Sequence, residues 1–372
     1  MKSRFLQIDW LLVLFLIPVL FAGLVTMKSF TSVTPYFSHQ FVFIGISFLI
    51  FFLFSLIDFR FLRRTDVLVI IFLFFISLLI LVLFAGHTSN GAKSWFDFGV
   101  FSFQPSDMMK LVLILVLAKY FSRRHVEIRN IKHIFISAIY AIVPFTLVFL
   151  QPDFGSAMII FFIWFGMTLV SGISKKHLFM VMGLGVLAFA MLWMFVFVPY
   201  QKARVLNFVY PLADVRGSGY NVYQSTIAVG SGQIFGKGVG FGTQSRLQFL
   251  PEYQTDFVFA AFAEEWGFAG VVLLFILIGL ILWRILRTAM LGATNFEILF
   301  GIGLTIYIAS HMIINIGMNI GLMPVTGITM PFMSYGGSHL VTEFVGLGIL
   351  MGMRGYSRVA HRDDMRNEFL GI

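Results

Sequence analysis

Residues 66–86 read DVLVIIFLFFISLLILVLFAG, and after Asp66 this stretch contains no charged side chain. An α-helix needs about 20 predominantly apolar residues to cross the hydrocarbon core of a bilayer. The stretch therefore predicts a transmembrane helix. It also indicates the class of the whole protein, because similar runs recur on both sides of it.

Apolar runs of this kind occupy most of the chain. The predicted spans are residues 10–28, 41–58, 66–86, 106–121, 133–151, 155–172, 177–198, 262–283, 298–321 and 338–354. The segments between them leave no room for a soluble domain. We therefore expect an all-α integral membrane protein with about ten transmembrane helices, forming a single polytopic domain over residues 1–372.

The composition excludes several other classes. Hydrophobic residues make up 59% of the chain and charged residues 12%, whereas soluble proteins carry about 25% charged residues. The formal charge of +9 does not indicate nucleic-acid binding, because the basic residues fall in short clusters between apolar runs. Without cysteine there is no disulfide, cysteine metal site or cysteine nucleophile. Residues 10–27 lack an A-x-A-like end, so we expect a retained first helix and not a cleaved signal peptide.

The basic residues also predict the orientation in the membrane. With the N-terminus inside, the inner segments carry 18 Lys and Arg residues and the outer segments carry 7. Cytoplasmic loops are enriched in these residues. We therefore expect both termini in the cytoplasm and residues 199–261, between the seventh and eighth spans, as a large extracytoplasmic loop.

The outer segments contain the unusual sequence. Loop 199–261 is rich in glycine, yet its scattered aromatic and aliphatic residues favour an ordered loop that returns to the membrane surface. Residues 87–106 are amphipathic, and residues 323–338 contain proline and glycine but no charge. Because long loops are often functional or disordered, we look for functional residues on this face.

Three ionisable residues lie near the outer ends of spans. Asp107 and Lys110 are three residues apart in the fourth span, so they share a helix face and can pair. Ionisable residues in a membrane are functional by default, and the alternative is an ion pair that only holds two helices together. Asp153 follows a Gln-Pro pair at a helix junction, where it either serves in function or only caps the sixth span.

Asp256 is the leading catalytic candidate. It lies between the end of the large loop and an apolar stretch, at the outer mouth of the eighth span. A carboxylate there can act as a general base or hold a divalent cation. The alternative is an acid that only stabilises the positive end of a helix dipole. Glu264 and Glu265 follow two turns later, where one can face the bundle interior and the other the interface.

Two further features are weaker signals. Residues 230–238 read GSGQIFGKG, which superficially resembles a P-loop, but the spacing is wrong and Gly238 replaces the required Ser or Thr. Backbone amides in this run could still bind phosphate oxygens. His311 and His339 lie near the outer ends of the ninth and tenth spans without a zinc-type spacing, so we expect them to be packing residues.

Several stretches together resemble a known family. They are residues 91–95, 103–107, 151–155, 219–221, 224–225, 227–232, 235–238, 242–244, 249–252, 255–257, 264–265, 322–327 and 334–338. In this order they resemble the SEDS family (shape, elongation, division and sporulation), which includes RodA and FtsW, across nearly the whole chain. The family usually has Glu where this chain has Asp107. The short tails favour the RodA branch over FtsW.

The resemblance implies a peptidoglycan glycosyltransferase on the outer face of the bacterial cytoplasmic (inner) membrane. The 4-hydroxyl of one lipid-linked sugar attacks the anomeric carbon of another with inversion, and polyprenyl pyrophosphate leaves. Asp256 matches the family's essential aspartate, as the base or as the holder of a metal such as Mg²⁺, with no organic cofactor. Substrate binding is implied for Lys110, Asp107, Lys202, Arg204, Lys237, Glu252, Gln224 and Ser334.

The resemblance also implies partners. They are lipid II, the growing glycan strand, the surrounding membrane lipid and a class B penicillin-binding protein that supplies the transpeptidase, with no nucleic acid. The alternatives are an FtsW-type division polymerase, a lipid II flippase and a structural scaffold. A flippase should line the full membrane depth with charge, whereas these candidates gather on the outer side. A scaffold would not need Asp256.

Overall fold

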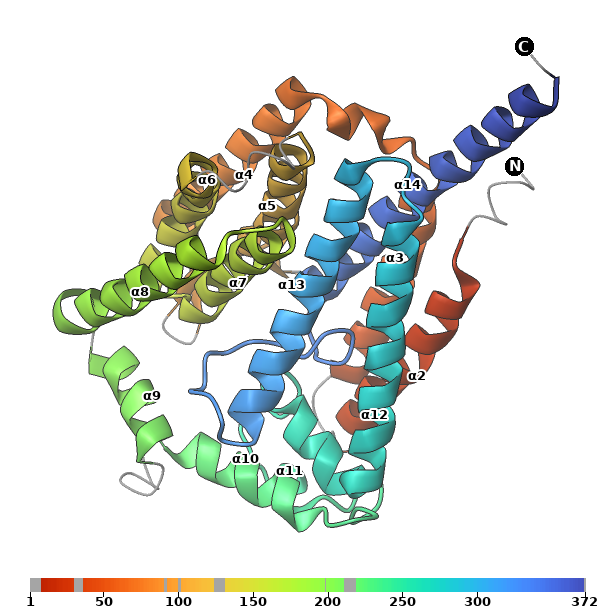
Figure 1. Cartoon of the computed structure of the whole chain (residues 1–372). Helices are drawn as coiled ribbons and strands as arrows, with labels where there is room; N and C mark the ends of the chain where they lie inside the picture. Colours follow the sequence, from red (N-terminus) through yellow and green to blue (C-terminus); the bar gives the residue numbers. More distant parts are fainter. Residues whose placement is uncertain are drawn as a thin grey trace.

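The structure is a computed structural model that describes residues 8–29, 36–89, 92–99, 102–123, 131–197, 199–210 and 219–370. The long helices are α2 (Trp10–Ser29), α3 (Tyr36–Ser55), α4 (Thr65–Ala85), α5 (Pro105–Ser122), α6 (Ile131–Leu150), α7 (Phe154–Val170), α8 (Lys175–Met191), α12 (Val258–Met290), α13 (Asn295–Asn319) and α14 (Gly337–Leu370). Each of the ten predicted spans falls on one of them (Figure 1). The all-α membrane class is therefore confirmed.

Within the described residues, seven helical segments are long and apolar enough to cross a membrane. They are α2, α3, α4, α6, α12, α13 and residues 175–195, which join α8 to the π-helical turn η2 (Leu192–Val196). Helix α5 carries three charged residues, and α7 has only 17 residues. Helix α14 continues past residue 354, the predicted end of its span. The prediction followed the apolar run, which ends there, whereas the helix extends to Leu370. The exact number of spans stays a prediction.

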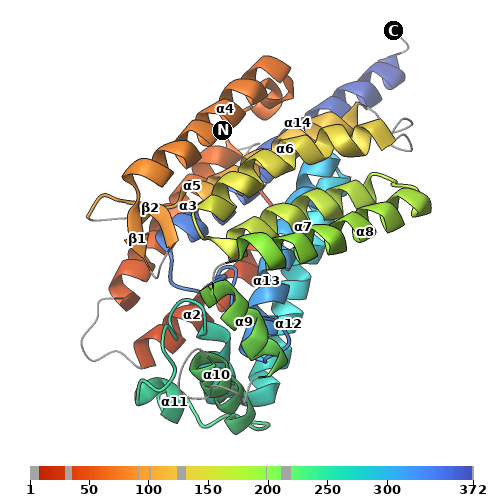
Figure 2. The same ribbon diagram turned by 90° about the vertical axis from the view of Figure 1, so that its left-hand side faces the viewer.

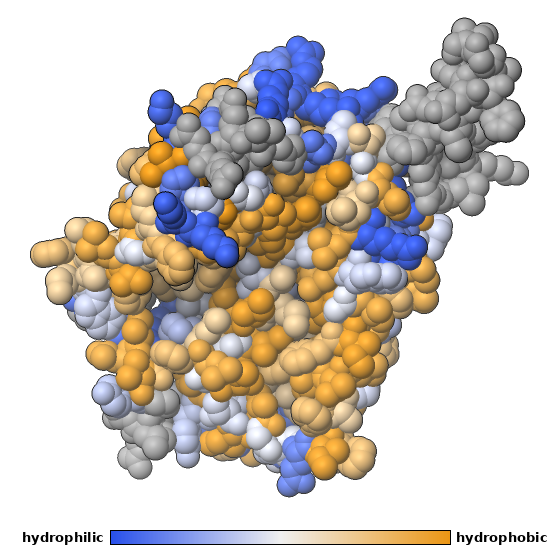
Figure 3. Space-filling view, in the orientation of Figure 1, coloured by the Kyte–Doolittle hydropathy of each residue, from blue (hydrophilic) through white to orange (hydrophobic). Residues whose placement is uncertain are grey.

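The surface is apolar over most of the molecule. Figure 3 shows hydrophobic residues over the middle of this face and strongly hydrophilic ones gathered at the end where α12 connects to α13. Exposed side chains include Phe84 on α4, Phe179 on α8 and Phe195 in η2, each more than three-quarters exposed. An apolar surface of this extent fits lipid contact, because soluble proteins expose only small apolar patches.

The helices form a central group with a looser periphery. Helix α13 packs against α5, α7, α12 and α14, while α2 packs on α12 and α3 on α14. Helices α4 and α6 pack against each other and against α5 at the periphery of the bundle (Figure 2). In α8 only Val181 is buried, so this helix contributes little to the core. Helices α5 and α13, by contrast, have buried side chains along their whole length.

A small sheet occupies the segment that we predicted only as amphipathic. Strands β1 (His87–Ser89), β2 (Ala92–Asp97) and β3 (Ser102–Phe103) pair antiparallel in the order β1-β2-β3. The sequence analysis missed it because two- to six-residue strands are too short for a periodic signal. The sheet precedes α5 and packs on α4, α5 and α14.

The large loop is ordered wherever the structure describes it. It contains α9 (Pro199–Val209), α10 (Tyr220–Ser231) and the single turn α11 (Thr243–Arg246). Helix α10 packs on α12 and α13, at the lower end of the molecule in Figure 1. The described part of the loop therefore contains helical segments, while an ordered extracytoplasmic loop that returns to the membrane surface stays a prediction.

Helix α12 is interrupted at Gly267, where φ is +65° and ψ is −168°. The break leaves carbonyl groups without helical partners. The backbone amides of Lys237 and Gly238 donate to the carbonyls of Glu264 and Glu265, each at 3.0 Å. The glycine-rich run of the loop therefore completes the broken helix.

This arrangement explains why the run needs glycine. Gly236 has φ of +78°, and a Cβ there would lie 2.1 Å from the Glu265 carbonyl oxygen. A Cβ on Gly267 would lie 2.2 Å from the Gly236 nitrogen. The suggestion that amides of this run bind phosphate is wrong for Lys237 and Gly238, because those amides are engaged by the helix.

A buried ion cluster ties three helices together at the opposite end from α10. Asp9, just before α2, accepts from Arg284 of α12 at 2.6 Å and lies 3.2 Å from Arg354 of α14. Thr288 donates to the same carboxylate oxygen. Two guanidinium groups around one carboxylate satisfy its charge, as a buried acid requires.

Candidate active site

The turn before α12 carries Asp256. The amides of Thr255 and Phe257 both donate to the carbonyl of Glu252, at 3.1 and 3.2 Å. Glu252 has φ of +50°, a left-handed conformation that is uncommon for residues other than glycine. Leu250, Tyr253 and Phe257 are buried in an apolar cluster that also includes Ala228, Ala260 and Ala261. The turn is thus anchored on α10 and on the start of α12.

Two asparagines of α13 hold the backbone of Asp256. The side-chain amides of Asn315 and Asn319 each donate to the Asp256 carbonyl at 2.9 Å. The side-chain oxygen Oδ1 of Asn319 accepts from the backbone amide of Ala260, which is one of the first amides of α12. Both asparagines are fully buried and one helical turn apart. Asp256 is therefore positioned through its main chain, and its carboxylate is not used for that purpose.

The segment between α13 and α14 holds the turn from the other side. The hydroxyl of Ser334 donates to the carbonyl of Thr255 at 2.6 Å, and the amide of Tyr335 donates to the carbonyl of Gln254 at 2.8 Å. Gln40 of α3 binds the carbonyl of Ser334 in turn. Ser334, which the resemblance assigned to substrate binding, is buried here and supports the turn.

The carboxylate of Asp256 is partly buried and makes no hydrogen bond or ion pair with any residue that the structure describes. Burial and, after it, the nearby charge of Glu252 raise its pKa to about 7, while Arg204 of α9 opposes the shift. A carboxyl group with a pKa near neutrality changes protonation state under physiological conditions. It is therefore suited to accept a proton in a reaction.

Asp153 lies within electrostatic reach of both Asp256 and the pair of charges on α5. Asp153 caps α7, as predicted, by accepting from the backbone amide of Ser156 at 2.9 Å. It also accepts from the side-chain amide of Gln104. Burial raises the pKa of Asp153, and Lys110 opposes that shift. The charge of Asp153 in turn acts on Asp256. These acids and bases therefore belong to one electrostatic region.

The predicted pair of Asp107 and Lys110 is present. Their side chains are 3.0 Å apart and almost completely buried, at 3% and 1% exposed. At this exposure Lys110 does not reach any surface. A contact between Lys110 and a substrate would therefore require the surrounding helices to move.

The remaining predicted substrate residues are dispersed. The Lys202 ammonium lies 6.0 Å from the centre of the Trp193 ring. Lys237 donates to the buried carboxylate of Glu264 at 2.6 Å and to Thr243. Lys237 thus forms an ion pair with Glu264, and among the described residues it makes no hydrogen bond or ion pair with the Asp256 turn.

Two polar residues of the predicted set remain, one in the turn and one on α10. The Glu252 carboxylate accepts from the Thr255 hydroxyl at 3.1 Å and stays exposed. Gln224 lies on α10, and its side-chain oxygen is buried without a hydrogen-bond partner in the described part of the chain. An unpaired buried oxygen costs stability, so Gln224 is a group that a ligand or water would satisfy.

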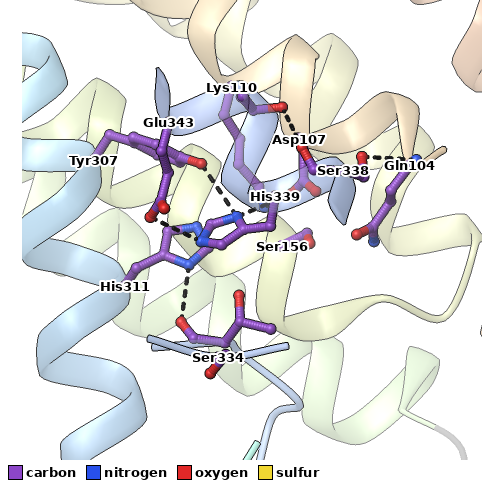
Figure 4. A network of polar contacts seen from close by, with 12 residues as sticks. Gln104, Asp107, Lys110, Ser156, Tyr307, His311, Ser334, Ser338, His339 and Glu343 are labelled. Atoms are coloured by element: carbon purple, nitrogen blue, oxygen red, sulfur yellow. Dashed lines mark hydrogen bonds and ion pairs between the residues drawn. The ribbon is translucent and has the colours of Figure 1, made fainter. Parts of the chain in front are cut away.

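The sequence analysis missed a polar cluster around His339. Figure 4 shows this side chain between Asp107 on one side and Glu343 and Tyr307 on the other. The His339 nitrogens lie 3.7 Å from Asp107 and 3.1 Å from Glu343, and the ring of His311 lies 4.5 Å away. The prediction that both histidines are packing residues is wrong. Only the three-dimensional meeting of α5, α13 and α14 reveals the cluster.

Comparison with known proteins identifies the family. A model of the FtsW/RodA/SpoVE family, described as cell cycle proteins, matches residues 3–359. The chain belongs to the FtsW/RodA/SpoVE family. The resemblance to RodA and FtsW noted in the sequence is therefore confirmed.

Individual relatives of the FtsW/RodA/SpoVE family match most of the chain. Stage V sporulation protein E of Bacillus subtilis (strain 168) is 36% identical over 363 residues, covering 94% of this chain and 98% of that protein. The peptidoglycan glycosyltransferase MrdB of Escherichia coli (strain K12) is also 36% identical, over 284 residues and 76% of both chains. Equal identity to both relatives does not separate the branches of the family.

A solved structure gives the same result for the fold. A chain of a peptidoglycan synthase complex, studied for the coordination of polymerization and crosslinking, superposes with a TM-score of 0.80 at 31% identity. The match covers 94% of this chain and 98% of that chain. The expectation of an enzyme of the glycosyltransferase class agrees with the names of these FtsW/RodA/SpoVE relatives.

Proposed function

We propose that this chain polymerises lipid II into glycan strands at the outer face of the cytoplasmic membrane, by inverting glycosyl transfer. The observation that carries the proposal is the free carboxylate of Asp256, held by its main chain and surrounded by charged groups. The elongation role of the RodA branch is part of the proposal.

Asp256 would act as the general base. As the 4-hydroxyl oxygen of the acceptor sugar forms a bond to the anomeric carbon of the donor, the carboxylate takes the hydroxyl proton. The bond from the anomeric carbon to the pyrophosphate oxygen breaks, and its electron pair leaves with the polyprenyl pyrophosphate. Such a base works best with a pKa near the operating pH, which fits the value of about 7 for Asp256.

The leaving pyrophosphate needs positive charge nearby. Arg204 is the better placed of the predicted basic residues, because it is partly exposed on α9 and its charge already acts on Asp256. Lys110 is buried and paired with Asp107, which favours the alternative that this pair is structural. Lys202 lies two residues before Arg204 in the same turn of α9 and is a second basic candidate for this role.

A divalent cation fits this site only with help from the substrate. Within the described residues, no group of three His, Asp or Glu side chains could hold a metal ion. Mg²⁺ commonly uses one or two carboxylates together with substrate phosphates and water. Asp256, with Glu252 beside it, would supply the protein oxygens for such a cation, which would neutralise the pyrophosphate charge.

The partner and the alternatives follow from the same site. A class B penicillin-binding protein would crosslink the product, as the coordination of polymerization and crosslinking in the related complex suggests. A flippase or scaffold would not require a poised base at Asp256. An FtsW-type division role would use the same chemistry in a different complex.

The decisive test is polymerisation by the purified protein. Wild type in detergent, given lipid II and Mg²⁺, should produce glycan strands, whereas Asp256→Asn should not. Asn keeps the size of the side chain but does not accept the proton. Wild-type protein that moves lipid II between leaflets of vesicles without polymerising it would support the flippase instead.

A further inference from the structure

The cluster around His339 reaches the Asp256 turn through a continuous set of contacts. We propose that Glu343 is a positioning residue for Asp256, acting through residues 330–335 of the segment between α13 and α14. This inference rests on the proposed function, in which Asp256 takes the proton.

The first contact is between Glu343 and the backbone of Phe332. The carboxylate oxygen Oε2 accepts from the Phe332 amide at 3.0 Å, and Glu343 is completely buried. Phe332 has φ of +60°, a left-handed conformation that is unfavourable for a bulky residue and persists only when its surroundings enforce it. Glu343, on α14, provides the acceptor for the Phe332 amide in this conformation.

The second set of contacts runs from this bend to the turn. The Met330 amide donates to the Ser334 hydroxyl at 2.7 Å, and the same hydroxyl donates to the Thr255 carbonyl at 2.6 Å. The Tyr335 amide adds a further bond to the carbonyl of Gln254. A shift of the bend at Phe332 therefore moves Ser334 and, with it, the residue before Asp256.

The third set of contacts fixes Glu343 itself. Its other oxygen lies 3.1 Å from His339, whose second nitrogen lies 3.7 Å from Asp107, and Asp107 binds Lys110 (Figure 4). Buried carboxylates require compensating charge. His339 therefore lies between the two carboxylates, and its contact with the second oxygen of Glu343 helps to hold that side chain in place.

Side-chain length and charge can be separated at this position. Glu343→Gln keeps an oxygen at the right distance from the Phe332 amide but loses the charge. Glu343→Asp keeps the charge but withdraws the oxygen by one methylene. Positioning through the Phe332 amide predicts that Gln retains polymerisation within about threefold of wild type, whereas Asp and Ala lose about ten- to a hundredfold, because small misplacements of reacting groups have effects of this size.

Glu297 provides a matched control. It is also a buried glutamate that binds a basic side chain, Arg63, and a backbone amide, that of Ala293 at 2.7 Å. It lies at the other end of α13 from Asn315 and Asn319. Glu297→Ala should lower the melting temperature by a similar amount to Glu343→Ala while leaving the catalytic rate constant within about threefold of wild type.

The experiment measures kcat and KM for lipid II together with amide hydrogen exchange in the full-length protein. We expect Glu343→Ala and Glu343→Asp to lower kcat more than they raise KM and to speed exchange in residues 252–257 and 330–335. Should Glu343→Ala fail to fold, the comparison of Gln with Asp decides the matter. Aspartate outperforming glutamine, or unchanged exchange at residues 252–257, would overturn the proposal.

Hydrogen exchange also keeps this inference distinct from the proposed function. If wild type does not polymerise lipid II, the function fails, yet faster exchange at residues 252–257 in Glu343→Ala would still demonstrate the mechanical link. If wild type polymerises and exchange is unaffected by Glu343→Ala, only the positioning role is lost.

Discussion

Replacing Asp256 with Asn separates its chemistry from its place in the fold. Loss of a general base slows a reaction by about 10²- to 10⁴-fold. The turn should survive, because Asn315 and Asn319 bind the main-chain carbonyl of residue 256 and not its side chain. We therefore expect Asp256→Asn to accumulate and melt like wild type while its polymerisation rate falls by at least a hundredfold.

The pH dependence gives this prediction a second, quantitative form. With the pKa of Asp256 at about 7, the ionised fraction is roughly a tenth at pH 6 and about nine tenths at pH 8, so the wild-type rate should rise about tenfold between them. Glu252→Gln removes a charge that raises this pKa and should shift the midpoint of the profile to lower pH.

As pH rises, the stability of the folded protein should fall, whereas the polymerisation rate should rise. The folded pKa of Asp256 lies above its unfolded value of about 3.9, so the folded state retains the proton longer as pH rises. Stability is therefore lost between about pH 4 and pH 7. Asp256→Asn lacks this loss and should melt no lower than wild type at pH 8. Polymerisation by the variant at the wild-type rate, or a flat wild-type profile from pH 6 to 8, would refute the assignment.

Three further predictions concern orientation, the broken helix and the partner. A cysteine at exposed Arg246 should react with an impermeant thiol reagent in spheroplasts and one at exposed Asn295 should not; the reverse pattern would invert the orientation. Gly267→Ala should destabilise the protein by about 2 kcal/mol or more, whereas Gly279→Ala, with open space around it, should be neutral or stabilising in thermal melts. Mild solubilisation should recover a class B penicillin-binding protein with this chain, and recovery of the chain alone under several detergents would contradict that partnership.

The sequence predicted features that depend on near neighbours in the chain. Apolar runs located the helices because burial in lipid selects for them residue by residue. The cap at Asp153 and the pair of Asp107 with Lys110 were predicted because both partners lie within three residues. Asp256 could be placed at the start of a helix for the same reason.

Contacts between distant segments were beyond this reasoning. His339 meets Asp107 across 232 positions of sequence, and a lone histidine carries no sign of such a partner. The amides of the glycine-rich run were considered free for phosphate because the sequence around Gly267 has an otherwise helical pattern. The helix break there, which binds the amides of Lys237 and Gly238, could not be seen. Ser334 was predicted to bind substrate, whereas its contact with Thr255 shows a supporting role.

The attachment of Asp256 through its carbonyl has a consequence for the evolution of such chains. Since no described residue depends on the carboxylate for a hydrogen bond, mutation can erase the chemistry and leave the architecture untouched. A descendant with a neutral residue at this position would still insert into the membrane, fold and bind its partners. Loss of the aspartate in a relative would therefore mark a pseudoenzyme, retained for assembly after its catalytic purpose had gone.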